Sequence, residues 1–73
     1  MKRFIPTLDG DYINEDLIRY FSVRKIPLEN YWYIVAYLNE FDGDGNREYY
    51  YIASDFKTEE CAYEFLDNIL KED

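Results

Sequence analysis

The stretch from Tyr31 to Phe56 constrains the fold most strongly. Two runs rich in aromatic and β-branched residues flank a short polar segment that contains Gly43 and Gly45. Runs of this composition favour β-strands, and a short Gly-containing segment between them favours a turn. The stretch therefore predicts a β-hairpin, one side of which must cover the core of the domain.

Successive residues of a strand face opposite sides of its sheet, so the hairpin predicts two groups of side chains. The predicted core side carries Trp32, Ile34, Ala36, Leu38, Tyr50, Ile52, Ser54 and Phe56. The opposite side carries Tyr31, Tyr33, Val35, Tyr37, Tyr49, Tyr51 and Ala53. A sheet face in contact with water normally carries charged or small polar residues. Five tyrosines occupy this one instead, and we call four of them the tyrosine band: Tyr33, Tyr37, Tyr49 and Tyr51.

After Phe56 the hydrophobic period changes to that of a helix. The apolar residues Ala62, Phe65, Leu66, Ile69 and Leu70 follow i, i+3, i+4 spacing, which predicts a helix over about residues 59–71. Thr58 is the expected N-cap, and acidic residues in the first turn and Lys71 in the last suit the helix dipole.

The N-terminal third predicts shorter elements. Residues 4–8 form a first strand, placed at a sheet edge because Pro6 has no amide hydrogen to donate. Asp9 and Gly10 predict a tight turn, residues 12–14 a return strand, and Asn14 the start of a single helical turn that ends near residue 17 or 18. Residues 19–26 predict another strand with a bulge or bend, because their alternation is ambiguous. The fold class is α+β, an antiparallel meander sheet of about four strands packed by one C-terminal helix, in a single domain over residues 1–73.

The chain has a formal net charge of −8, which belongs to its second half. Residues 38–73 hold eleven acidic and three basic residues, whereas residues 1–37 hold five of each. Direct binding to nucleic acid or to anionic membranes is disfavoured, because both require a basic surface. The single cysteine, Cys61, excludes an intrachain disulfide. With no signal peptide or membrane span evident in the sequence, we expect a cytoplasmic protein.

Residue types that support catalysis or metal binding are scarce. The chain has no histidine, which excludes catalytic triads of the Ser-His and Cys-His kinds. The run from Asp42 to Asn46 matches the first ligand positions of a calcium loop, but Arg47 and Ala53 occupy the positions that require Gly and Glu. We therefore expect no enzyme activity, no cofactor and no metal, and we interpret Cys61 as a small packing residue at the border of the helix stripe.

The segment Thr7-Leu8-Asp9-Gly10-Asp11-Tyr12-Ile13-Asn14-Glu15-Asp16-Leu17-Ile18 resembles the opening of small β-rich proteins of Gram-positive bacteria and their phages. It is also similar to short flagellar FlbD-like proteins, in which a comparable opening precedes a hairpin and a terminal helix. The resemblance implies this topology and assigns no functional residue.

Two surfaces are candidates for function. The tyrosine band is either a set of cross-strand pairs that stabilise the sheet or a contact surface, since Tyr is enriched in interface cores. A third interpretation, stacking on single-stranded bases, is weakened by the lack of flanking Lys and Arg. The acidic residues either keep the protein soluble or imitate the phosphates of a nucleic acid. The candidate partner-binding residues are Tyr33, Tyr37, Tyr49, Tyr51, Asp42, Asp44, Glu48, Glu60, Glu64 and Asp67.

From these surfaces we expect a non-enzymatic module that binds a basic, nucleic-acid-binding protein. Its most concrete form is a phage or mobile-element inhibitor of the anti-CRISPR or DNA-mimic kind. The alternative is a homodimeric structural protein of a bacterial host that pairs through its tyrosine-rich face or through the edge of the hairpin.

Overall fold

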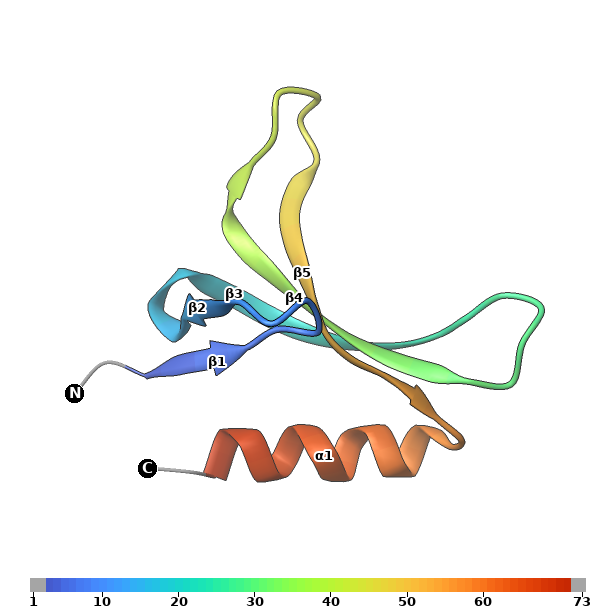
Figure 1. The fold of residues 1–73 in the computed structure, drawn as a ribbon. Helices are drawn as coiled ribbons and strands as arrows, with labels where there is room; N and C mark the ends of the chain where they lie inside the picture. Colours follow the sequence, from blue (N-terminus) through green and yellow to red (C-terminus); the bar gives the residue numbers. More distant parts are fainter. Residues whose placement is uncertain (1–2, 72–73) are drawn as a thin grey trace.

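A computed structural model describes residues 3–71 and shows an α+β fold with five strands, one single-turn 3-10 helix and one C-terminal helix (Figure 1). In chain order the elements are β1 (Phe4–Pro6), β2 (Tyr12–Asn14), η1 (Glu15–Leu17), β3 (Ile18–Lys25), β4 (Trp32–Phe41), β5 (Arg47–Phe56) and α1 (Glu59–Lys71). The predicted α+β class and C-terminal helix are confirmed. The predicted single meander of about four strands is wrong, because the strands form two separate sheets.

The smaller sheet is the antiparallel hairpin β1–β2. Its turn is held by the amide of Thr7, which donates to the carbonyl of Asp11 at 2.7 Å, and by the Thr7 hydroxyl, which accepts from the Asp11 amide at 3.1 Å. Gly10 adopts a φ of +93° there, a conformation that glycine reaches without steric cost. The short strands leave this sheet dependent on the core, into which it inserts Ile5 and Ile13.

The larger sheet has the order β3-β4-β5, and both strand pairs are antiparallel. The register shifts between Ile18 and Tyr20, so the predicted irregularity near the start of β3 is confirmed as a bulge. On the far side of β4 the register shifts again between Ile34 and Val35, where three residues of β5 face two of β4.

That second bulge corrects the predicted sides of two residues. A one-residue bulge reverses the alternation beyond it. Ala53 pairs with the core residue Ile34, and Ser54 lines a hollow with Tyr33 and Tyr51 on the other face. A third register shift lies next to Asp55, whose φ of +66° is left-handed, and it returns Phe56 to the core.

Helix α1 forms where the hydrophobic period predicts it. The Thr58 hydroxyl accepts from the backbone amide of Cys61 at 3.1 Å, which confirms the predicted N-cap. Ala62 and Leu66 are buried against the sheet. At the other end the guanidinium of Arg3 donates to the carbonyls of Ile69 and Leu70, groups that the helix itself leaves unpaired.

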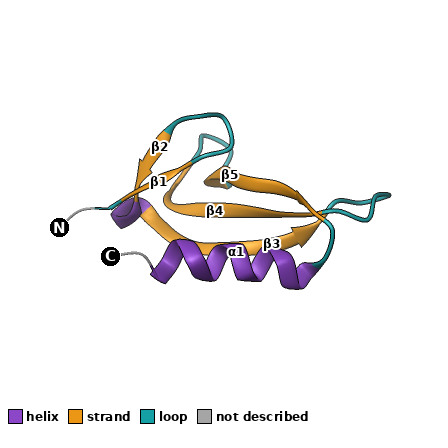
Figure 2. Ribbon diagram, turned by 60° about the horizontal axis from the view of Figure 1, so that its bottom comes forward, coloured by secondary structure: helices purple, strands orange, loops and turns teal. Residues whose placement is uncertain are grey.

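The core lies between the helix and one face of the larger sheet, and the hairpin β1–β2 closes its side (Figures 1 and 2). Its buried residues are Ile5, Ile13, Ile34, Ala36, Leu38, Ile52, Ala62 and Leu66. The far end of the β4–β5 hairpin extends away from the helix (Figure 1). Among residues 3–71, no helix combines the length and apolar character needed to cross a membrane.

Candidate functional site: the tyrosine face

The side of the larger sheet opposite the helix carries the predicted tyrosine band and, in addition, Tyr20 of β3. We call these five residues the tyrosine face: Tyr20, Tyr33, Tyr37, Tyr49 and Tyr51. Their rings form an unbroken series across all three strands. The ring centroids lie 4.9 Å apart for Tyr20–Tyr37, 6.0 Å for Tyr37–Tyr49, 5.4 Å for Tyr49–Tyr51 and 5.7 Å for Tyr33–Tyr51.

The strand register explains this series. Tyr37 pairs with Tyr20 on one side and with Tyr49 on the other, so three phenols lie in one row across the sheet. The Tyr20–Tyr37 pair is stacked at 28°, and the Tyr49–Tyr51 pair is nearly perpendicular at 77°. Both arrangements are favourable for aromatic rings, at about 0.5–1.5 kcal/mol per pair beyond the area they bury.

Val35 shows that the tyrosine face includes a buried aliphatic side chain as well as aromatic rings. Its side chain is only 2% exposed, yet it does not belong to the core cluster beneath the helix. Strand alternation places it between Tyr33 and Tyr37 on β4, and it pairs with Tyr51 of β5. The surrounding rings therefore shield Val35 from water and form a second, smaller hydrophobic cluster.

The same face carries the cation of Arg24 and the phenol of Tyr51, whose pKa is shifted. The guanidinium carbon of Arg24 lies 5.7 Å from the ring centroid of Tyr37, within cation–π range. The pKa of the Tyr51 phenol is raised above its ordinary value, first by its hydrogen bond with Tyr49 and then by the charge that Tyr49 acquires at high pH. Desolvation and the neighbouring Tyr33 and Tyr37 act in the same direction.

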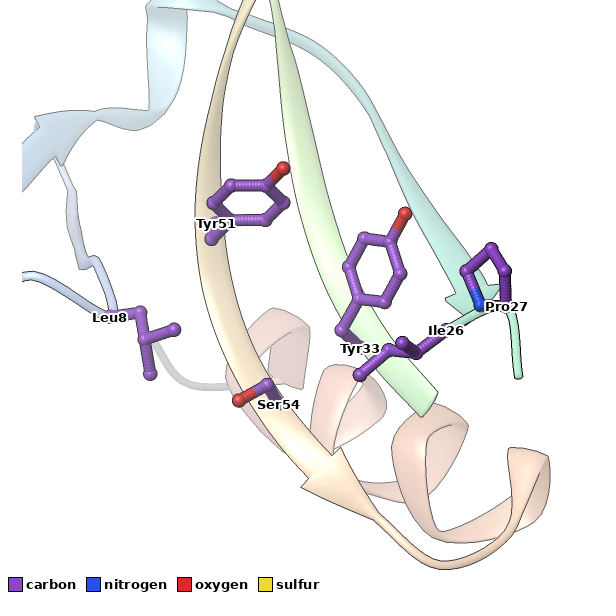
Figure 3. A pocket seen from close by; sticks show the side chains of 6 residues that line it. All are labelled: Leu8, Ile26, Pro27, Tyr33, Tyr51 and Ser54. Atoms are coloured by element: carbon purple, nitrogen blue, oxygen red, sulfur yellow. The ribbon is translucent and has the colours of Figure 1, made fainter. Parts of the chain in front are cut away.

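A hollow of about 360 Å³ opens at one end of the tyrosine face (Figure 3). Its lining comes from four parts of the chain: Leu8, Ile26, Pro27, Tyr33, Tyr51 and Ser54. The rings of Tyr33 and Tyr51 stand side by side on β4 and β5, with Leu8 and Pro27 at the two flanks (Figure 3). The Leu8 amide donates to the Tyr51 carbonyl at 2.8 Å, which fixes the loop between β1 and β2 at this margin.

The acidic residues of the hairpin turn adjoin the other end of the face. A second hollow of about 280 Å³ is lined by Asp42, Arg47, Glu48, Tyr49 and Tyr50, so Tyr49 belongs to both surfaces. Asp42 has a structural role, because its carboxylate accepts the backbone amides of Asp44 and Asn46 at 2.9 and 3.0 Å. This is the hydrogen-bonded turn expected for such a segment, and it leaves the exposed Asp44 and Glu48 as the charges available to a partner.

The predicted acidic residues of the helix lie elsewhere. Glu60, Glu64 and Asp67 are exposed on α1, which packs on the opposite side of the sheet from the tyrosine face. The tip of the β4–β5 hairpin is remote from that helix (Figure 1). The structure thus joins the tyrosine band to the turn acids and separates both from the helix acids.

The structure also bears on the predictions for Cys61 and for metal binding. Cys61 is exposed, so its interpretation as a packing residue is wrong: the helix turns it away from the stripe that Ala62 and Leu66 bury. Within residues 3–71 no group of three or more acidic or cysteine side chains is arranged to hold a metal ion.

Sequence reasoning missed Tyr20 and most of the hollow. Tyr20 joins the face because β3 alternates regularly from Tyr20 onward with Phe21 and Val23 on the core side, and that alternation was the signal that could have found it. Leu8, Ile26 and Pro27 reach the hollow through tertiary packing, for which the sequence carries no local signal.

Comparisons with known proteins add no identification: no protein-family model, curated protein or solved structure matches the chain.

Proposed function

We propose that this chain is a small, non-enzymatic protein-binding module that docks through its tyrosine face. The observation that carries the proposal is the series of five phenol rings in mutual contact, in which Tyr49 and Tyr51 remain 51% and 45% exposed. Tyrosine is enriched in interface cores and among the residues that dominate binding energy. Rings held by their neighbours lose little conformational freedom on docking, which favours affinity.

The partner in this proposal carries a basic surface. The chain has a net charge of −8, the exposed Glu48 lines a hollow together with Tyr49, and the exposed Asp44 belongs to the adjoining hairpin turn. Opposite charge steers association and fixes the orientation of the two proteins. Proteins that bind nucleic acids present basic surfaces of this kind to phosphates.

The most concrete form of the proposal is an inhibitor encoded by a phage or mobile element. It would occupy the basic site of a nucleic-acid-binding host protein, as small anti-CRISPR and DNA-mimic proteins do. Glu60 and Glu64 are about 6 Å apart along the helix axis from a rise of ~1.5 Å per residue, near the repeat of a phosphate backbone. Glu60 and Glu64 lie on the opposite side of the sheet from the tyrosine face. Separate variants can therefore test phosphate mimicry by the helix and docking by the tyrosine face.

A pull-down of tagged protein from host lysate tests the proposal. The double variant Tyr49→Ser/Tyr51→Ser should lose the partner, and the control Tyr12→Ser/Tyr63→Ser should retain it, since both control residues are exposed and lie outside the tyrosine face. Equal recovery with the two double variants would contradict docking through this face.

The same captured partner tests whether complementary charge contributes to binding. Recovery should fall as salt rises, because exposed charges are screened. Asp44→Ser/Glu48→Ser should weaken binding if the turn supplies the complementary charge. Glu60→Ser/Glu64→Ser/Asp67→Ser should weaken it if the helix does. Binding that is indifferent to salt and to both sets would contradict a basic partner.

A homodimer is the alternative, since one continuous aromatic face could cover a second copy of itself. Mass measured in solution separates the two, because a monomer at high protein concentration removes the dimer.

A further inference from the structure

The chain already packs its own arginines against aromatic rings at two places on the larger sheet. Arg24 lies over Tyr37 at 5.7 Å, and Arg47 lies over Phe41 at 4.6 Å from the ring centroid. A guanidinium over an aromatic face is attracted by the negative charge of the π system. Aromatic rings of this sheet thus hold cations, and two other rings of the sheet, Tyr33 and Tyr51, line the hollow of about 360 Å³.

We propose that the hollow between Tyr33 and Tyr51 is a binding pocket for an arginine side chain of the partner protein. This inference rests on the proposed function and names the chemistry by which the partner is recognised. The two rings are inclined at 67° with centroids 5.7 Å apart, so they form a corner with faces in two directions. Both stand on the side of the sheet away from the helix (Figure 3).

The rest of the lining suits the two parts of an arginine. Leu8, Ile26 and Pro27 offer apolar surface to the aliphatic stem, which long cationic side chains bury while their charged ends stay polar. The Ser54 hydroxyl can accept a hydrogen bond from the guanidinium, which carries five N–H donors. The volume lies near the lower end of the ~300–1,000 Å³ that ligand pockets occupy.

The charges around the pocket also favour a cation. Asp9 follows Leu8, Asp55 follows Ser54, and Glu29 is two residues beyond Pro27, whereas the bases near the lining are Lys25, which precedes Ile26, and Arg24, which pairs across the strands with Tyr33. These charged side chains are all exposed. Three acidic residues against two basic ones leave the neighbourhood of the hollow with a net negative charge, which favours a guanidinium over an uncharged side chain.

Three short peptides test the pocket in the intact chain. Acetyl-Gly-Arg-Gly-amide is compared with the same peptide containing citrulline, which is uncharged and nearly isosteric, and with one containing leucine. Binding is followed by NMR chemical shifts of the ring protons of Tyr33 and Tyr51. We expect the arginine peptide to bind about 2- to 30-fold more tightly than the citrulline peptide, the range of a single cation–π contact.

Two variants localise the effect. Tyr33→Leu should remove the preference for arginine, and Tyr33→Phe should keep it because the ring remains. Tyr63→Leu is the matched control, since Tyr63 is exposed on the helix, lies outside the tyrosine face and does not line the pocket, so its replacement should leave the preference unchanged.

Binding of the leucine peptide as tight as that of the arginine peptide would overturn the inference in favour of an apolar anchor. Absence of shifts with all three peptides would overturn it outright, and so would an arginine preference that survives Tyr33→Leu. Failure here is distinguishable from failure of the proposed function. If Tyr49→Ser/Tyr51→Ser loses the captured partner while Tyr33→Leu retains it, docking through the face stands and the arginine pocket falls.

Discussion

Replacing Val35 with alanine tests whether the tyrosine face is a packed cluster. Val35 is 2% exposed and is enclosed on the side opposite the helix. The substitution removes two methyl groups, worth about 1.6 kcal/mol at ~0.8 kcal/mol per buried carbon. The cavity left behind raises the expected loss to roughly 2 kcal/mol. For a domain of this size such a loss corresponds to a fall in Tm of about 8–16 °C.

Urea denaturation followed by far-ultraviolet circular dichroism measures the change in the free energy of unfolding. Val23→Ala is the matched control, because Val23 is only partly buried on the helix side and should cost less. The near-ultraviolet tyrosine signal of Val35→Ala should also weaken as the rings lose their support. A loss below about 0.5 kcal/mol, typical of surface positions, would refute the enclosure of Val35 by the rings.

Three further predictions concern local features. The raised pKa of Tyr51 means that unfolded Tyr51 loses its proton near pH 10 while the folded residue keeps it, so stability should be unaffected below that pH and fall as the pH rises through the folded pKa. Tyr49→Phe should lower the pKa of Tyr51 when tyrosinate absorbance is followed against pH, and an unchanged pKa would contradict the influence of Tyr49 on Tyr51. Thr58→Ala should destabilise the protein by about 1 kcal/mol in urea, because it removes the N-cap hydrogen bond, and Thr58→Ser should not. Leu28 is fully exposed with a φ of +68°, so Leu28→Gly should leave stability unchanged or raise it by up to about 1 kcal/mol, whereas a clear loss in thermal unfolding would show that its side chain makes contacts.

Local chemistry was enough to predict several elements of the fold. The helix over Glu59–Lys71 and its cap at Thr58 follow from hydrophobic period and capping preference, both of which depend on neighbouring residues. The turn at Gly10 and the single 3-10 turn after Asn14 follow in the same way, and Asn14 does accept the amide of Asp16.

Long-range pairing was not predictable to the same degree. Alternation read at a fixed period of two put Ser54 in the core and Ala53 outside, and the bulge between Tyr51 and Ala53 exchanged them. Two short strands that look like the start of a meander pair only with each other, because β2 leads through the 3-10 turn into β3 and not into a common sheet. The tyrosine band was predictable because β4 alternates regularly from Tyr33 to Tyr37 and β5 alternates regularly from Tyr49 to Tyr51, where the two strands pair without a bulge from Val35 to Tyr37.

Mass-spectrometric footprinting of tyrosines tests the central claim most directly. Tyrosines are nitrated in the free protein and in the complex captured from host lysate, and the extent of modification is compared at each position. Docking through the tyrosine face predicts that Tyr20, Tyr49 and Tyr51 are modified when free and protected in the complex, while Tyr12 and Tyr63 react equally in both. Protection of Tyr12 or Tyr63 with undiminished modification of Tyr49 and Tyr51 would contradict it.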